Sequence, residues 1–426
     1  MCLRGVVLLA VAVGCSEPSS PAEEAAGRTE QTAITPGERG AQPDGDDPLA
    51  GLDDPSTFDD GAGASGPPAD VPAGGCAFYT GEPTRLWARG GLAEVVDAGD
   101  DGFVVAGYAR KEEGEELFAV RVEPGSAPRP LYRADLERPL RTPRVAPPGL
   151  GRLADGSFGI AATDLGARVL FARVHPAGRQ SALRSLDTGT DQRFSPAVRS
   201  SGGGALVAFT DGSNERSRVR VVVTNAVGER TAVYDVTPAA GSAQAPVFIA
   251  DRLAFLDPRE GTSQLMAVRA SSARPITDAE VLVPIANLFD PAGLALAEAS
   301  EGFAVAYTAV GRGAKTAVGF VRTDDPAQPP KALVPSSGYG PLHVDATSSD
   351  TVIVYAASRS TAEARDTPRE LAVFAAPRSA PDSWGEPLVM AAPAFAPRVA
   401  RHGEDYAVVY GTDNAVFARF FRCREP

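Results

Sequence analysis

The chain repeats a pattern of short segments about every fifty residues, and this repeat restricts its folds more than any other feature. Each unit starts near a proline, passes through a turn that contains Gly or Asp, and continues into a strongly apolar run. Seven such runs occur, at residues 102–106, 158–161, 206–209, 253–255, 302–307, 352–355 and 406–410. A unit of this size cannot bury its apolar side chains alone, so like units must stack on one another.

Each unit has room for four strands. The apolar run is followed by a polar hairpin and a third strand, as at 118–121 and 417–419, and by a weaker fourth strand, as at 231–234. The chain contains 44 Gly and 37 Pro, a content that favours many short strands over helices. Four strands in about fifty residues are typical of a propeller blade, in which neighbouring blades cover both faces of the second strand. We therefore expect an all-β fold, a seven-bladed β-propeller of four-stranded blades over residues 76–426. A tandem of β-sandwiches, with a period of about ninety residues, is the alternative.

The repeat length resembles that of kelch-type and related seven-bladed propellers more than that of the shorter WD40 repeat. The resemblance covers residues 76–426, but its motifs are generic: the Gly-Gly doublets of kelch repeats do not recur. The segment 382–385 (Asp-Ser-Trp-Gly) is a single faint match to the Asp-box of sialidases. The propeller family therefore stays open at this point.

The N-terminus has the form of an export signal. Arg4 precedes ten apolar or small residues, 5–14, which are too few to span a bilayer. Residues 12–15 (Ala-Val-Gly-Cys) resemble the lipobox of bacterial lipoproteins, and this resemblance implies a signal peptide over 1–14 and acylation of Cys15. Resemblance to Gram-negative lipoproteins, with Ser16 after the cysteine, implies sorting to the outer membrane, periplasmic or surface-facing. An ordinary signal peptide cleaved elsewhere is the alternative.

Residues 15–75, the lipidated cysteine and the segment after it, form an expected tether. Positions 16–75 contain 13 acidic and two basic side chains and few apolar ones, so they should stay disordered, with a mean reach of about 45 Å. This segment accounts for −11 of the net charge of −13, and residues 76–426 carry only −3. The folded part therefore lacks the basic field of a nucleic-acid-binding protein.

The four cysteines divide by position. Cys2 leaves with the signal peptide and Cys15 takes lipid, which leaves Cys76 and Cys423 at the two ends of the repeats. Two thiols in an oxidising compartment should pair, with two free thiols as the alternative. The last unit lacks a fourth strand, and residues 77–87 precede the first unit. We therefore expect this N-terminal segment to supply the outer strand of the last blade, with Cys76 beside Cys423.

Catalytic and metal-binding motifs are absent from the sequence. No His-Glu-x-x-His, Gly-x-Ser-x-Gly or Cys-x-x-Cys occurs, and we expect no cofactor and no metal site. Propeller ligands bind where several innermost strands meet at the channel mouth, and the polar candidates there are Arg144, Arg398, Asp290 and His343, with Asp345 on the face of His343. The two arginines could bind an anion, or could be solvated. The recurrent aromatic residues Phe194, Phe289, Tyr339 and Phe395 fit packing between blades better than a sugar-stacking ring.

These features favour a monomeric, non-catalytic binding or scaffolding lipoprotein of the bacterial envelope, attached to the membrane through lipid, with a protein or glycan partner that the sequence does not identify. A secreted carbohydrate-active hydrolase or lyase is the alternative, and two carboxylates converging at the channel mouth would favour it. A third hypothesis is the propeller lipoprotein of the outer-membrane assembly machinery. That family has eight blades and tryptophan-bearing motifs, whereas this chain has only Trp87 and Trp384.

Overall fold

The structure, a computed structural model, describes residues 66–424 with gaps, all within the compact unit Pro48–Pro426. The longer gaps are 137–145, 271–279, 287–293, 323–330, 333–342, 359–368 and 376–387, and most side chains between 271 and 394 are not described either. Among the described residues every regular element is a β-strand, and no described helix is long and apolar enough to cross a membrane.

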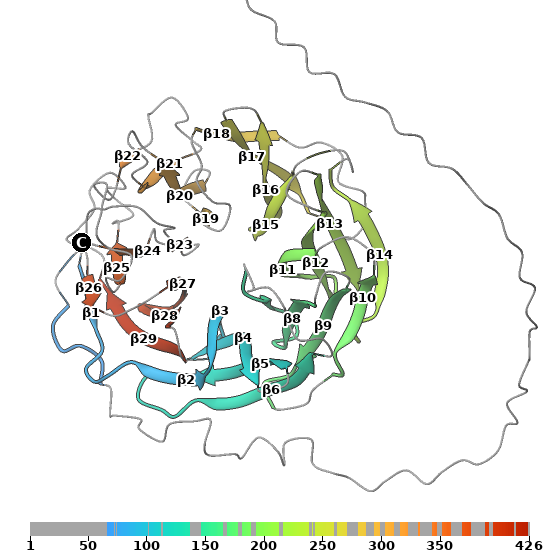
Figure 1. The fold of residues 1–426 in the computed structure, drawn as a ribbon. Helices are drawn as coiled ribbons and strands as arrows, with labels where there is room; N and C mark the ends of the chain where they lie inside the picture. Colours follow the sequence, from blue (N-terminus) through green and yellow to red (C-terminus); the bar gives the residue numbers. More distant parts are fainter. Residues whose placement is uncertain are drawn as a thin grey trace, which may run out of the picture. The chain divides into compact units, whose positions relative to one another are not determined.

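The strands of the described residues form seven antiparallel sheets (Figure 1). Six sheets have four strands each, and the first two contain β3 (Gly90–Asp97), β4 (Phe103–Lys111), β5 (Gly114–Val122) and β6 (Arg129–Leu136), and then β7 (Gly149–Arg152), β8 (Phe158–Thr163), β9 (Arg168–Val174) and β10 (Arg184–Thr188). The third and fourth contain β11 (Arg193–Ser201), β12 (Gly204–Gly212), β13 (Ser217–Thr224) and β14 (Arg230–Asp235), and then β15 (Gln244–Ile249), β16 (Arg252–Arg259), β17 (Thr262–Arg269) and β18 (Glu280–Ala286). The fifth and sixth contain β19 (Leu294–Glu298), β20 (Phe303–Val310), β21 (Thr316–Arg322) and β22 (Lys331–Ala332), and then β23 (His343–Ala346), β24 (Val352–Ser358), β25 (Arg369–Ala375) and β26 (Leu388–Ala391).

The remaining sheet has five strands. It combines β27 (Phe395–His402), β28 (Asp405–Gly411) and β29 (Ala415–Cys423) with two short strands from the N-terminal end, β1 (Cys76–Phe78) and β2 (Thr84–Ala88). The first strand of each sheet contacts the first strand of the next, and β27 contacts β3. The expected all-β propeller with four-stranded blades is thus confirmed in its main outline, and the fifth strand of this sheet departs from it.

The burial of the strands follows their place in each sheet. All nine residues of β12 are buried, as are the first seven of β4, because apolar side chains on both faces of a second strand pack against neighbouring sheets. The fourth strand β14 is only partly buried. These two patterns agree with the expected sandwiched second strand and half-solvated fourth strand.

Three of the recurrent prolines lie in β-bulges of the first strands. The register shifts between Phe194 and Ala197, between Gln244 and Val247, and between Phe395 and Arg398, so that Pro196, Pro246 and Pro397 fall at positions without a regular ladder partner. A proline has no N–H to donate, and a bulge tolerates it for that reason. Two of these bulges hold an alanine with positive φ immediately before the proline, Ala245 at 53° and Ala396 at 47°.

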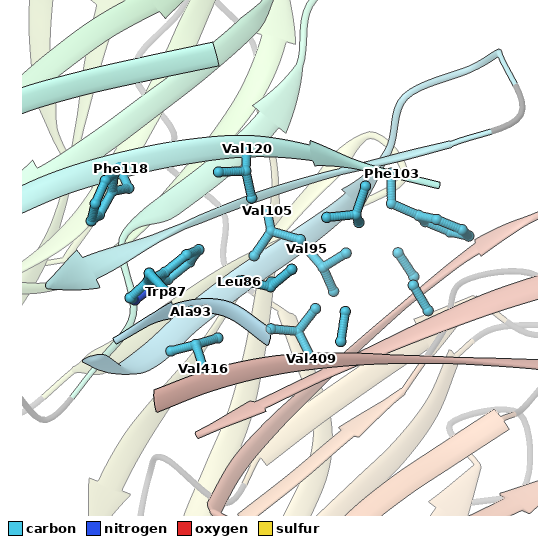
Figure 2. Close-up of a cluster of buried hydrophobic side chains, with 14 of the residues drawn as sticks. Leu86, Trp87, Ala93, Val95, Phe103, Val105, Phe118, Val120, Val409 and Val416 are labelled. Atoms are coloured by element: carbon cyan, nitrogen blue, oxygen red, sulfur yellow. The ribbon is translucent and has the colours of Figure 1, made fainter. Parts of the chain in front are cut away.

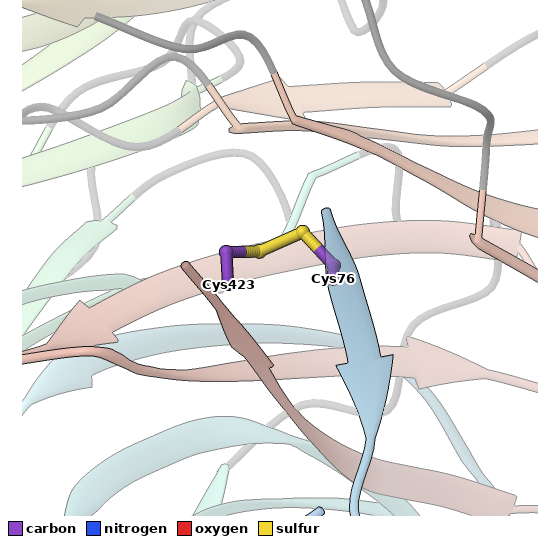
Figure 3. The surroundings of a disulfide bond; sticks show 2 residues. All are labelled: Cys76 and Cys423. Atoms are coloured by element: carbon purple, nitrogen blue, oxygen red, sulfur yellow. A yellow bond between two sulfur atoms is a disulfide. The ribbon is translucent and has the colours of Figure 1, made fainter. Parts of the chain in front are cut away.

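The N-terminal strands pair with the last strand of the chain. β1 pairs with β29 in a register that sets Cys76 opposite Cys423, and β2 pairs with the first half of β29. The two cysteines form a disulfide that links residues 347 apart in sequence (Figure 3). The expected outer strand and the expected disulfide are both confirmed, although the outer strand is split in two.

The strand β2 also fills the core between the last sheet and the sheet β3–β6 (Figure 2). Leu86 and Trp87 are almost completely buried, and the Trp87 ring stacks on Phe118 with centroids 5.5 Å apart. A Cβ on Gly107 would lie 2.3 Å from the indole, so only glycine fits beneath it. The N-terminal strands β1 and β2 therefore contribute apolar packing as well as hydrogen bonds.

Candidate functional site

Only one of the four candidate residues at the channel mouth has a described side chain. Arg398 lies in β27, just after the proline bulge. His343 begins β23, but its side chain is outside the described part, and Arg144 and Asp290 lie outside the described residues altogether. Cys15 and the side chains of the four recurrent aromatic residues are outside it as well. The proposed convergence of these groups therefore stays a prediction.

Arg398 forms an ion pair across the junction of the first and last sheets. Its Nε lies 3.3 Å from a carboxylate oxygen of Glu94 in β3, and its Nη1 donates to the carbonyl of Pro397 at 3.0 Å. Both side chains are partly buried, with exposed fractions of 16% and 26%, so bulk water screens this pair less than a surface one. The Arg398 charge is thus opposed by a carboxylate on the neighbouring innermost strand.

A second polar pair spans the same junction near the other end of the strands. His402 Nδ1, at the end of β27, lies 2.8 Å from Asp97 Oδ1 at the end of β3. Glu94 and Asp97 are the two carboxylates of the first innermost strand, and a basic side chain of the last strand faces each of them. The two pairs fix the register of β27 against β3.

A cluster of three residues connects the segment between β1 and β2 to the last sheet. Tyr79 donates a hydrogen bond to Asp405 Oδ1 at 2.7 Å, and Arg422 binds both oxygens of the same carboxylate at 2.6 and 3.0 Å. Burial, followed by the hydrogen bond to Asp405, raises the pKa of Tyr79 to about 12. The hydrogen bond to Asp405 raises the pKa of Arg422. Because the phenol pKa moves away from neutrality, this cluster suits a structural contact better than proton transfer.

Arginines at the end of the third strand repeat in four sheets. Each forms an ion pair with an acid in or beside the turn between the first and second strands: Arg121 with Asp100, Arg173 with Asp155, Arg269 with Asp251, and Arg422 with Asp405. Arg173 also donates to the carbonyls of Gly203 and Ala226 in the next sheet. In each of these four sheets an arginine of the third strand thus contacts the turn that joins the first two strands.

Buried charges also lie between the second and third sheets. Asp187 and Asp211 have side chains only 8% and 1% exposed, and Arg220 Nη1 lies 2.6 Å from Asp187 and 3.4 Å from Asp211. Arg220 Nε also donates to Asp235 at 2.8 Å. One guanidinium thus contacts three carboxylates and links β10 to β13.

Sequence reasoning missed the two pairs between β3 and β27 for one reason. Glu94 and Arg398, like Asp97 and His402, belong to opposite ends of the repeat array, and no local spacing relates them. Ring closure was the available signal: once β27 was placed beside β3, their polar residues could have been compared. In the described part of the chain, no group of three or more His, Cys, Asp or Glu side chains is arranged to hold a metal ion.

No protein-family model matches the chain, and no curated protein matches it in sequence. A solved structure shares its fold, and others are more distantly similar. The lectin BP39L from Burkholderia pseudomallei has a TM-score of 0.53 and 15% identity, over 78% of this chain and 96% of the lectin. A puromycin-hydrolysing peptidase from Mycobacterium tuberculosis has a TM-score of 0.45 and 18% identity over 76% of this chain. A puromycin hydrolase has a TM-score of 0.47 and 15% identity.

The chain spans about half the length of the two hydrolases, 52% and 50%. At these identities the likeness concerns the fold alone, and the lectin aligns over nearly its whole length. The comparisons therefore support the propeller architecture and leave the ligand to other arguments.

Proposed function

We propose that this chain is an exported, lipid-anchored protein of the bacterial envelope whose propeller binds a protein or glycan without catalysing a reaction. The Cys76–Cys423 disulfide carries this proposal, because structural disulfides persist in the periplasm or at the cell surface and are rare in the cytosol. Acyl chains on Cys15 would hold the protein in the outer membrane, and residues 16–75 would let the propeller search for its partner.

We also infer that the seven sheets are the blades of one closed ring. Contacts between the first strands of successive sheets, and between β27 and β3, support a ring without an open edge. The pairing of β1 and β2 with β29 supports the same arrangement. A closed ring offers a partner two faces of turns, while the outer edges stay short.

The partners of the two carboxylates in β3, the first innermost strand, support the non-catalytic assignment. A carbohydrate hydrolase uses two carboxylates in different protonation states on either side of the scissile bond. Glu94 and Asp97 instead each face a basic side chain of β27, at 3.3 and 2.8 Å. Both carboxylates are therefore engaged by side chains of the neighbouring strand, and neither is placed as one of the acid–base pair that this reaction needs.

Lipid anchoring is tested by metabolic labelling with radioactive palmitate. The native chain should incorporate label and fractionate with outer membranes, Cys15→Ala should lose the label, and Cys2→Ala serves as the matched control that keeps it. Label in the Cys15→Ala chain, or none in the native chain, would contradict the anchor.

Binding and hydrolysis are separated on the purified protein. It is incubated with envelope polysaccharides, and reducing ends are counted; in parallel, cross-linked partners from intact envelopes are identified by mass spectrometry. We expect a saturable partner and no new reducing ends. Reducing ends that disappear in a Glu94→Gln, Asp97→Asn chain, but persist in Glu229→Gln at an exposed turn, would establish the hydrolase instead.

A further inference from the structure

The closing segment, residues 76–88, joins the rest of the propeller through one residue. β2 ends at Ala88 and β3 begins at Gly90, so Arg89 alone connects the last sheet to the first. Arg89 is exposed and has a φ of 57°, a left-handed conformation that arginine seldom adopts. The next position is crowded, because a Cβ on Gly90 would lie 2.1 Å from the Trp87 indole nitrogen. Short hinges under strain favour the exchange of the element they hold, since an extended hinge relieves the strain.

The site that receives the closing segment is complementary to it in hydrogen bonds and in apolar surface. β29 pairs with both β1 and β2, and Phe421 packs edge-on against Phe78 with ring centroids 6.3 Å apart. Without the segment, β29 would be an exposed edge strand with unpaired N–H and C=O groups. The best-matched occupant of such an edge is the same segment from a second copy.

We propose that the closing segment can exchange between two copies of this chain, and that the Cys76–Cys423 disulfide commits it to its own chain. Before the bond forms, each copy can place its segment on β29 of the other and complete both propellers. The cysteines stand opposite one another in the β1–β29 register, so the bond forms with whichever copy supplies the segment. The inference does not depend on the proposed lipid anchor or on any ligand.

Single-cysteine chains make the exchange visible. In a background of Cys2→Ser and Cys15→Ser, one full-length chain carries Cys76→Ser and another carries Cys423→Ser. They are unfolded, mixed and refolded with oxidised glutathione, which takes up the two electrons and two protons released when an S–S bond forms between two thiols. Only an exchanged pair sets the remaining Cys423 of one chain opposite the remaining Cys76 of the other.

We expect a reducible heterodimer of twice the 44.0 kDa chain mass on non-reducing gels, well above the dimer from either chain refolded alone. Its fraction should rise with protein concentration toward the millimolar effective concentration of a linked segment. A mixture that yields no more dimer than the separate chains would overturn the proposal.

Three further chains keep the test decisive if a single-cysteine chain folds poorly. The chain with both Cys76 and Cys423 is refolded reduced at rising concentration and then oxidised, and covalent dimer should again increase. Arg89→Gly should lower that dimer fraction about fivefold, which corresponds to ~1 kcal/mol of hinge strain. Ala250→Gly relieves a similar φ of 47° at an exposed turn away from the hinge and should leave the fraction unchanged. Equal effects of the two substitutions, or monomer at every concentration, would refute the exchange.

Discussion

Removing the Cys76–Cys423 disulfide should lower the stability of the propeller by several kcal/mol while leaving its fold intact. The bond closes a loop of 347 residues, and the chain-entropy relation gives about 6 kcal/mol for a loop of that length. This is an upper figure, because residual structure in the unfolded chain lowers the entropy gained. The native contacts of β1 and β2 with β29 remain, so the strands stay paired in the folded state.

The magnitude translates into a melting temperature. Unfolding entropy of about 2 cal/mol/K per residue gives about 0.7 kcal/mol/K for a domain of this size, so 6 kcal/mol corresponds to a shift of about 8 °C. The assay compares thermal unfolding of the native chain with a Cys76→Ser, Cys423→Ser chain, each with and without reductant. Reductant should lower the native midpoint and leave the double variant unchanged. A shift below about 1 °C would refute the loop-entropy argument.

Three further predictions concern other contacts of the fold. Because the pKa of Tyr79 is raised in the folded state, its contribution to the free energy of unfolding is fully present below pH ~10 and is lost as the pH rises through about 12. In Tyr79→Phe, the free energy of unfolding should therefore fall less steeply with pH over that window. Ala245→Gly should raise the free energy of unfolding by up to ~1 kcal/mol because it relieves a φ of 53°, whereas Ala254→Gly in a buried strand should lower it by about as much. Arg220→Ala should cost about 2 kcal/mol, because charged hydrogen bonds are lost while Arg218 still pairs with Asp211 at 3.0 Å and Arg230 with Asp187 at 3.6 Å. Arg184→Ala, whose pair is 43% and 56% exposed, should cost less than ~1 kcal/mol; urea unfolding measures both.

The sequence carried the architecture because repetition and hydrophobicity are local signals. The apolar runs became second strands, as at β4 and β12. The prolines were expected simply at the start of the first strands, whereas Pro196 and Pro397 lie in bulges. A bulge depends on the partner strand, so its position cannot be obtained from one strand alone.

The closure could be predicted because the last repeat lacked a strand and two cysteines stood at the ends. The split into β1, which ends at Phe78, and β2, which begins at Thr84, could not, because which part of a segment pairs depends on its partner strand. The candidate site was harder still. Arg398 was recognised from its position beside Pro397, but its partner Glu94 lies 304 residues away in the chain, and only the closed arrangement brings them together.

A peptide map of the protein isolated from cell envelopes under non-reducing conditions tests the central claim most directly. We predict one cross-linked pair that joins the peptide containing Cys76 to the peptide containing Cys423, together with an N-terminal peptide that begins at an acylated Cys15. Free thiols at 76 and 423 in that preparation would contradict the closure of the propeller, and an unmodified Cys15 would contradict its attachment to the membrane.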